Sequence, residues 1–72
     1  MKKSKKIKIY LNGKKKNLEN EITIKKVLKL TNVQLNKVAI ELNNEIVNKK
    51  MINKIKLKND DRIEIVHFIG GG

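Results

Sequence analysis

The stretch KIKIYLNGKKKNLE at residues 6–19 decides how this chain begins to fold. Ile7, Ile9 and Leu11 alternate with polar neighbours, which is the period-two pattern of a half-buried strand. Asn12-Gly13 follows directly, and this pair strongly favours a two-residue hairpin turn, because both turn positions need positive φ. The residues KKKNLE therefore predict a second strand that pairs back on the first, and their polarity favours a place at the sheet edge.

The hydrophobic pattern changes period after the hairpin. In TIKKVLKLT at residues 23–31, Ile24, Val27 and Leu28 fall at positions i, i+3 and i+4, which places them on one helix face. Thr23 is the expected N-cap, because its hydroxyl can accept from the free N–H groups of the first turn. The pattern predicts one amphipathic helix of about two to three turns.

Alternation returns in the second half of the chain. VAIEL at 38–42 and RIEIVHF at 62–68 both alternate, and in the last strand we expect Ile63, Ile65 and His67 to face inward. Asn43-Asn44 makes a turn into a short EIV segment. In the connection that follows, apolar residues including Met51 are expected to contact a small core.

The order is strand, hairpin, strand, helix and then two or three more strands, which is the arrangement of a β-grasp domain. We predict an α+β fold with a mixed sheet of four to five strands packed on one main helix. Residues 1–68 form the expected single domain, and residues 69–72 the expected flexible C-terminal glycine tail.

The chain has 18 Lys and Arg residues and 7 Asp and Glu residues, which gives a formal net charge of +11. This positive charge favours an anionic partner as the first interpretation. The lysines are spread along the whole chain, however, and one Tyr and one Phe are the only aromatic residues. Single-strand binders stack bases on aromatic side chains. We therefore expect no nucleic-acid partner and keep a basic nucleic-acid-binding domain as a remote alternative.

No segment approaches the run of about twenty apolar residues that crosses a bilayer. The basic start also lacks the apolar stretch of a signal peptide. We therefore expect a cytoplasmic protein with no membrane partner, acting as a monomer.

Side chains that could perform chemistry are scarce. The absence of cysteine excludes a disulfide, a thiolate metal site and a cysteine nucleophile. His67 is the single histidine and has no second His or Cys with which to share a metal. Asp60 and Asp61 fall in an expected turn, and Gly13 is the only glycine before the tail, which excludes a phosphate-binding glycine loop. We predict no metal, no bound cofactor and no enzymatic activity.

The sequence ends in HFIGGG, so that three of its four glycines are the last three residues. Glycines at a chain end are commonly disordered and have no function. Here they follow a strand that the sheet should hold firmly, so they can act as a tether with the α-carboxylate of Gly72 at its tip. Residues 69–72 would reach roughly 13 to 14 Å when extended, and Gly70 and Gly71 would let channel walls approach closely. ATP could activate the carboxylate as an acyl-adenylate, and sulfide could displace AMP to leave a thiocarboxylate.

A tether of this kind needs a docking surface on the folded body. Ordering four residues costs roughly 4 to 8 kcal/mol at 1 to 2 kcal/mol each, which contacts elsewhere must offset. Val66 and Phe68 face outward in the expected last strand, and outward apolar residues often mark contact sites. We predict that Tyr10, Val66, Phe68 and Ile69 dock the partner.

Two segments resemble a known family. VAIELNNEIV at 38–47 and NDDRIEIVHFIGGG at 59–72 resemble the ThiS-type sulfur carriers of thiamine biosynthesis, and residues 1–37 match more weakly. The resemblance implies a ubiquitin-like β-grasp fold. It implies that an E1-like adenylyltransferase of the ThiF type uses ATP and a sulfur donor to convert Gly72 to a thiocarboxylate, with Gly70 and Gly71 threading the enzyme's channel. The thiocarboxylate would pass its sulfur to a thiazole synthase of the ThiG type.

Three turn positions depart from the family pattern. Asn44 and Asp60 stand where glycine is usual, and Asn48 stands where proline is common. Asn and Asp tolerate turn geometry, so the fold is expected to survive these changes.

Other carriers of the same type remain alternatives. These are the small subunit of molybdopterin synthase, another ubiquitin-like sulfur carrier, and a modifier conjugated to lysines. Carriers of the molybdopterin type tend to have prolines just before the glycines, and this chain has no proline, which favours thiamine.

Overall fold

The Asn12-Gly13 hairpin forms as predicted in the computed structural model, which describes residues 6–68. Strands β1 (Lys6–Leu11) and β2 (Lys14–Glu19) pair antiparallel with Leu11 opposite Lys14. The turn has φ of 50° at Asn12 and 84° at Gly13, the two positive values that a type I′ turn requires.

Helix α1 (Ile24–Thr31) also begins where the capping residue predicts. The Thr23 hydroxyl accepts from the Lys26 N–H at 3.2 Å. The helix ends at Asn32, which is left-handed with φ 59°, a common way for a helix to stop.

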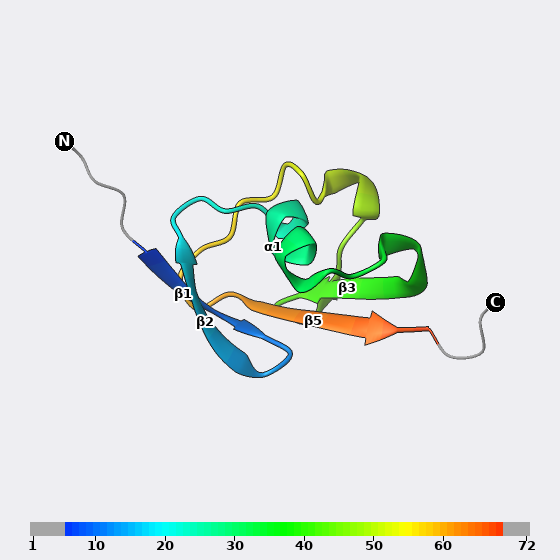
Figure 1. Cartoon of the computed structure of the whole chain (residues 1–72), viewed down its shortest axis with the longest axis horizontal. Helices are drawn as coiled ribbons and strands as arrows, with labels where there is room; N and C mark the ends of the chain where they lie inside the picture. Colours follow the sequence, from blue (N-terminus) through cyan, green and yellow to red (C-terminus); the bar gives the residue numbers. More distant parts are fainter. Residues whose placement is uncertain (1–5, 69–72) are drawn as a thin grey trace.

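In the described part of the chain, the sheet contains five strands in the order β2-β1-β5-β3-β4 (Figure 1). Its second half consists of β3 (Val38–Leu42), β4 (Glu45–Ile46) and β5 (Arg62–His67), with 3-10 turns at Leu35–Lys37 and Lys49–Met51. β5 lies between β1, to which it is parallel, and β3, to which it is antiparallel. The strand that leads to the C-terminus is therefore held on both sides.

The core lies between one face of the sheet and α1. The predicted inward residues Ile40 and Ile63 are fully buried. Met51, Ile52, Ile55 and Leu57 are the residues of the connection that we expect in this core, and Ile52 and Leu57 are buried there. Met51 is 43% exposed, contrary to that expectation, because the 3-10 turn carries it to the surface. Within residues 6–68, no helix has the length and apolar character needed to cross a membrane.

The three departures from the family pattern fit their backbone positions. Asn44 and Asp60 have φ of 73° and 72°, the left-handed region in which glycine is favoured and Asn and Asp are tolerated. Asn48 has φ −68°, the value that proline imposes. These side chains therefore preserve the turn geometry, as expected.

Candidate functional site at the end of strand β5

The last described residues are firmly attached to the sheet. Val66 pairs with Ala39, and His67 pairs with Val38. One residue further on, the Phe68 N–H donates to the Lys37 carbonyl at 3.0 Å. The chain is thus fixed to β3 up to Phe68, the point from which residues 69–72 continue.

The entry into β5 is fixed by side chains of the preceding turn. Asp61 accepts from the Lys58 N–H at 2.8 Å through Oδ2 and from Asn43 Nδ2 at 3.0 Å through Oδ1. Asn43 Oδ1 in turn accepts from the Arg62 N–H at 2.9 Å. Asp61 therefore stabilises the turn before β5, which is the role that its sequence position predicted.

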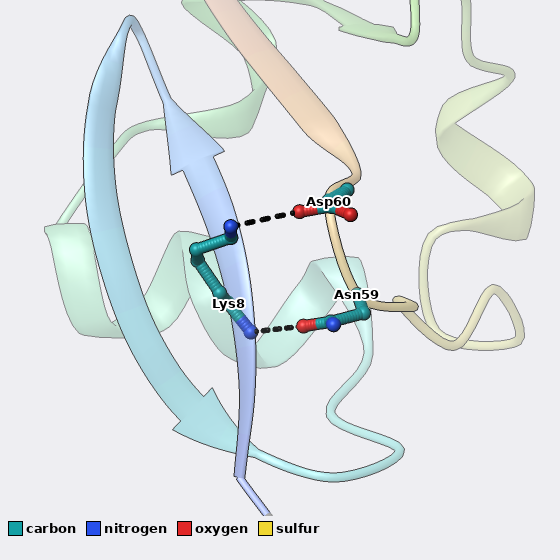
Figure 2. A network of polar contacts seen from close by, with 3 residues as sticks. All are labelled: Lys8, Asn59 and Asp60. Carbon is teal, nitrogen blue, oxygen red and sulfur yellow. Dashed lines mark hydrogen bonds and ion pairs between the residues drawn. The ribbon is translucent and has the colours of Figure 1, made fainter.

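Asp60 and Asn59 fasten the same turn to β1 (Figure 2). Lys8 Nζ lies 3.1 Å from Asp60 Oδ1, and the Lys8 N–H donates to Asn59 Oδ1 at 2.7 Å. The hydrogen bond and the charge of Asp60 raise the pKa of Lys8 above 10.5. β1 and the start of β5 are thus joined by side chains as well as by main-chain pairing.

An apolar patch lies on the outer face of the sheet, which α1 does not cover. Val66 is 49% exposed and lies beside Ala39, while Phe68 is 56% exposed. Lys49 Nζ stands 5.3 Å from the centroid of the Phe68 ring, within cation–π range. We call Ala39, Val66 and Phe68 the outer-face patch. It lies next to the position where the tail begins.

Tyr10 shares this face but lies apart from the patch. It pairs with Arg62 at the start of β5, four residues before Val66, or about 13 Å along a strand. The Arg62 guanidinium lies 4.8 Å from the Tyr10 ring centroid. The structure therefore brings Val66 and Phe68 together, but not Tyr10.

His67 is exposed, contrary to the expectation that it faces inward with Ile63 and Ile65. Strand alternation does place it on their face of the sheet. It lies beyond the end of α1, however, beside residues such as Asn32 and Gln34 that leave it open to solvent. Within residues 6–68, no group of His, Asp and Glu could hold a metal ion.

Two neighbours of the patch were missed in the sequence. Ile46 is 71% exposed and pairs with Glu41, which lies two residues from Ala39 on the outer face, and Lys49 Nζ lies 5.3 Å from the centroid of the Phe68 ring. β4 has only two residues, too few to show alternation. The remaining predicted site residues, Ile69, Gly70, Gly71 and Gly72, lie outside the described residues.

The comparisons with known proteins agree with this geometry. The model of the ThiS family matches residues 4–72. The chain belongs to the ThiS family. Sulfur carrier protein ThiS of Bacillus subtilis is 37% identical over 65 residues, covering 89% of this chain and 98% of that protein. The family resemblance predicted from the sequence is confirmed.

A solved structure confirms the predicted fold. The crystal structure of thiamine biosynthesis protein ThiS from Geobacter metallireducens superposes with a TM-score of 0.78 at 28% identity, covering 92% of this chain and all of that one. The ThiS β-grasp is thus shared despite the strongly basic composition of this chain.

A longer relative carries a ThiS-like segment as one of its parts. A thiazole synthase of Magnetococcus marinus is 41% identical over 66 residues, which are 92% of this chain but 20% of that protein. The chain therefore spans about a fifth of that relative's length.

Proposed function

We propose that this ThiS-family chain is the sulfur carrier for the thiazole part of thiamine and acts as a protein cosubstrate rather than an enzyme. The Gly72 carboxylate attacks the α-phosphate of ATP and releases pyrophosphate, which gives an acyl-adenylate. A sulfur donor at the oxidation level of sulfide then displaces AMP and leaves a thiocarboxylate. An E1-like adenylyltransferase of the ThiF type performs both steps and binds the ATP.

The observation that carries this proposal is the family match, which runs to residue 72 and so includes the terminal glycines. The geometry supports it. β5 is a central strand whose end is held up to Phe68, and the outer-face patch is exposed beside that end. A partner that binds the patch would receive residues 69–72 from a fixed starting point, with Gly70 and Gly71 suited to a narrow channel.

A thiazole synthase is the proposed acceptor of the sulfur. In the Magnetococcus protein named thiazole synthase, a segment similar to this chain belongs to the same polypeptide. Joining two proteins in one chain raises their effective concentration for each other, which benefits a carrier and its acceptor. The cytoplasmic location and the monomeric state remain predictions.

Intact-mass measurement tests the proposal. The chain is incubated with ATP, sulfide and a ThiF-type adenylyltransferase, and we expect a mass gain equal to the replacement of one oxygen by sulfur. Deletion of Gly72 should abolish the gain. Adding a ThiG-type thiazole synthase with its other substrates should return the mass to its starting value. An unchanged mass with active enzyme present would contradict the carrier function, whereas a thiocarboxylate that only molybdopterin synthase consumes would assign the other pathway.

A further inference from the structure

A second candidate interaction surface lies on the helix side of the sheet, between β2 and α1. Its floor is apolar and includes Leu18, Ile22 and Leu30. Leu30 is 62% exposed, whereas Ile22 is buried. The floor continues past Val27 of α1 and Leu11, the last residue of β1. We call this surface the β2–α1 groove.

The rim of the β2–α1 groove is positively charged. Lys6 and Lys26 line one part of it and Lys16 lines the other, while Glu19 is the one acidic residue among them. Lys26 and Leu30 are four residues apart in α1 and so lie on one helix face. An apolar floor with three lysines around it is complementary to an apolar segment flanked by carboxylates.

The free edge of β2 adds main-chain partners to this surface. β2 ends the sheet, and within residues 6–68 its only strand neighbour is β1. The two-residue turn makes Leu11 and Lys14 a hydrogen-bonded pair. Alternation along the ladder then points the main-chain groups of Lys15 and Asn17 away from β1. An open edge of this kind can pair with an added strand.

We propose that the β2–α1 groove binds an extended acidic and apolar peptide segment of a partner protein. The segment adds to the edge of β2 as a sixth strand, through the main-chain groups of Lys15 and Asn17. Its alternate apolar side chains cover Leu18 and Leu30, and its flanking carboxylates lie near the rim lysines. The β2–α1 groove lies on the face of the sheet that packs against α1, whereas the outer-face patch lies on the opposite face. A protein bound here therefore leaves the outer-face patch accessible, so this inference goes beyond the proposed carrier function.

A designed peptide tests the proposal on the full chain. The probe is the capped peptide DEVSITVED, in which three apolar residues alternate between acidic ends. We expect amide chemical-shift changes in β2 and α1 of the isotope-labelled chain. Binding should weaken as NaCl rises from about 0.05 M to about 0.5 M, because the rim charges are exposed. The same residues in the order VVIDESTED, and a lysine-flanked form KKVSITVKK, should both bind more weakly.

Matched variants test whether the peptide binds in the β2–α1 groove. Leu30→Glu should lower its affinity by about tenfold or more, since burial of one leucine is worth at least that much. Met51→Glu introduces the same negative charge at an exposed apolar residue outside the groove and should leave binding unchanged. Asn17→Pro removes an outward N–H at an edge, where proline is tolerated, and should also weaken binding. Thermal unfolding checks that each variant folds.

Several results would overturn the proposal. One is equal affinity for the scrambled peptide, and another is an unchanged affinity after Leu30→Glu. Shift changes confined to the outer-face patch would mean that the groove is not the site. A concentration-dependent dimer that Leu30→Glu dissociates, seen by sedimentation, would mean that a second copy of the chain occupies the groove.

Discussion

Asn12 Oδ1 accepts a 2.7 Å hydrogen bond from the N–H of Ile65, a residue 53 positions away in the chain. The bond extends the parallel pairing of β1 with β5. The Tyr10 N–H donates to the Asp61 carbonyl and the Asn12 N–H donates to the Ile63 carbonyl, and the next acceptor along β1 is the Asn12 side chain. The residue that turns the hairpin therefore also holds the strand that leads to the C-terminus.

Substitutions at Asn12 separate these two roles. Asn12→Gly keeps the positive φ but leaves the Ile65 N–H without this acceptor, and we expect a loss of about 1 kcal/mol of unfolding free energy. Asn12→Ala should lose about 1 to 2 kcal/mol more, because alanine is strained in the left-handed region. Asn12→Asp keeps both features and should lose least. Urea unfolding measures the three values, and equal losses for Gly and Ala would show that the turn conformation contributes nothing.

The Lys8–Asp60 ion pair predicts a pH-dependent contribution to stability. Its Asp60 partner raises the pKa of Lys8 in the folded chain above 10.5. The stabilisation is therefore fully present below the unfolded-state pKa and is lost as the pH rises through the higher folded-state pKa. Asp60→Asn keeps tolerance of positive φ but removes the charge. The difference in unfolding free energy between wild type and Asp60→Asn should be largest near neutral pH and should shrink above pH 10.5.

Lys8→Met is the matched control for that experiment. Once the lysine is absent, Asp60→Asn should have the same effect at neutral and at alkaline pH. A pH dependence that survives in the Lys8→Met background would assign the effect to another group.

Glu21 offers a stabilising substitution. Its φ is 65°, where a glutamate has no local advantage, and its ion pair with Lys56 is long at 3.7 Å between exposed side chains. Glu21→Gly should raise the unfolding free energy by about 0.5 to 1 kcal/mol, because relief of strain exceeds the loss of an exposed ion pair. Glu21→Gln keeps the strain and removes the charge, so thermal unfolding of both variants separates the two effects. A Glu21→Gly chain less stable than wild type would refute the prediction.

The elements that the sequence predicted correctly are those with local causes. The hairpin at Asn12-Gly13, the cap at Thr23 and the left-handed turn at Asn43-Asn44 each follow from a few adjacent residues, and all three form. The resemblance to the ThiS family is also carried by short stretches of adjacent residues, 38–47 and 59–72, and it predicted the β-grasp fold correctly.

The features that the sequence missed depend on long-range register. Tyr10 lies away from Val66 because parallel pairing sets it opposite Arg62, and no neighbour of Tyr10 in the chain indicates that. His67 is exposed because α1 ends before reaching it, which alternation in β5 does not reveal. The positive φ of Glu21 follows from the path between β2 and α1 rather than from any preference of glutamate.

Phe68→Ala tests the outer-face patch as the docking surface for the adenylyltransferase. Because Phe68 is 56% exposed, its removal should leave the urea midpoint almost unchanged. Truncating a central aromatic residue of an interface typically costs more than 1 kcal/mol, so kcat/KM for adenylation should fall about tenfold. Met51→Ala, an equally simple truncation of an exposed residue outside the patch, is the control and should adenylate normally. Tyr10→Ala should have a smaller effect than Phe68→Ala, since Tyr10 lies about 13 Å along the sheet from Val66. Unchanged adenylation kinetics for Phe68→Ala would exclude the patch as the docking surface while leaving the chemistry proposed for Gly72 intact, because the mass measurement tests that separately.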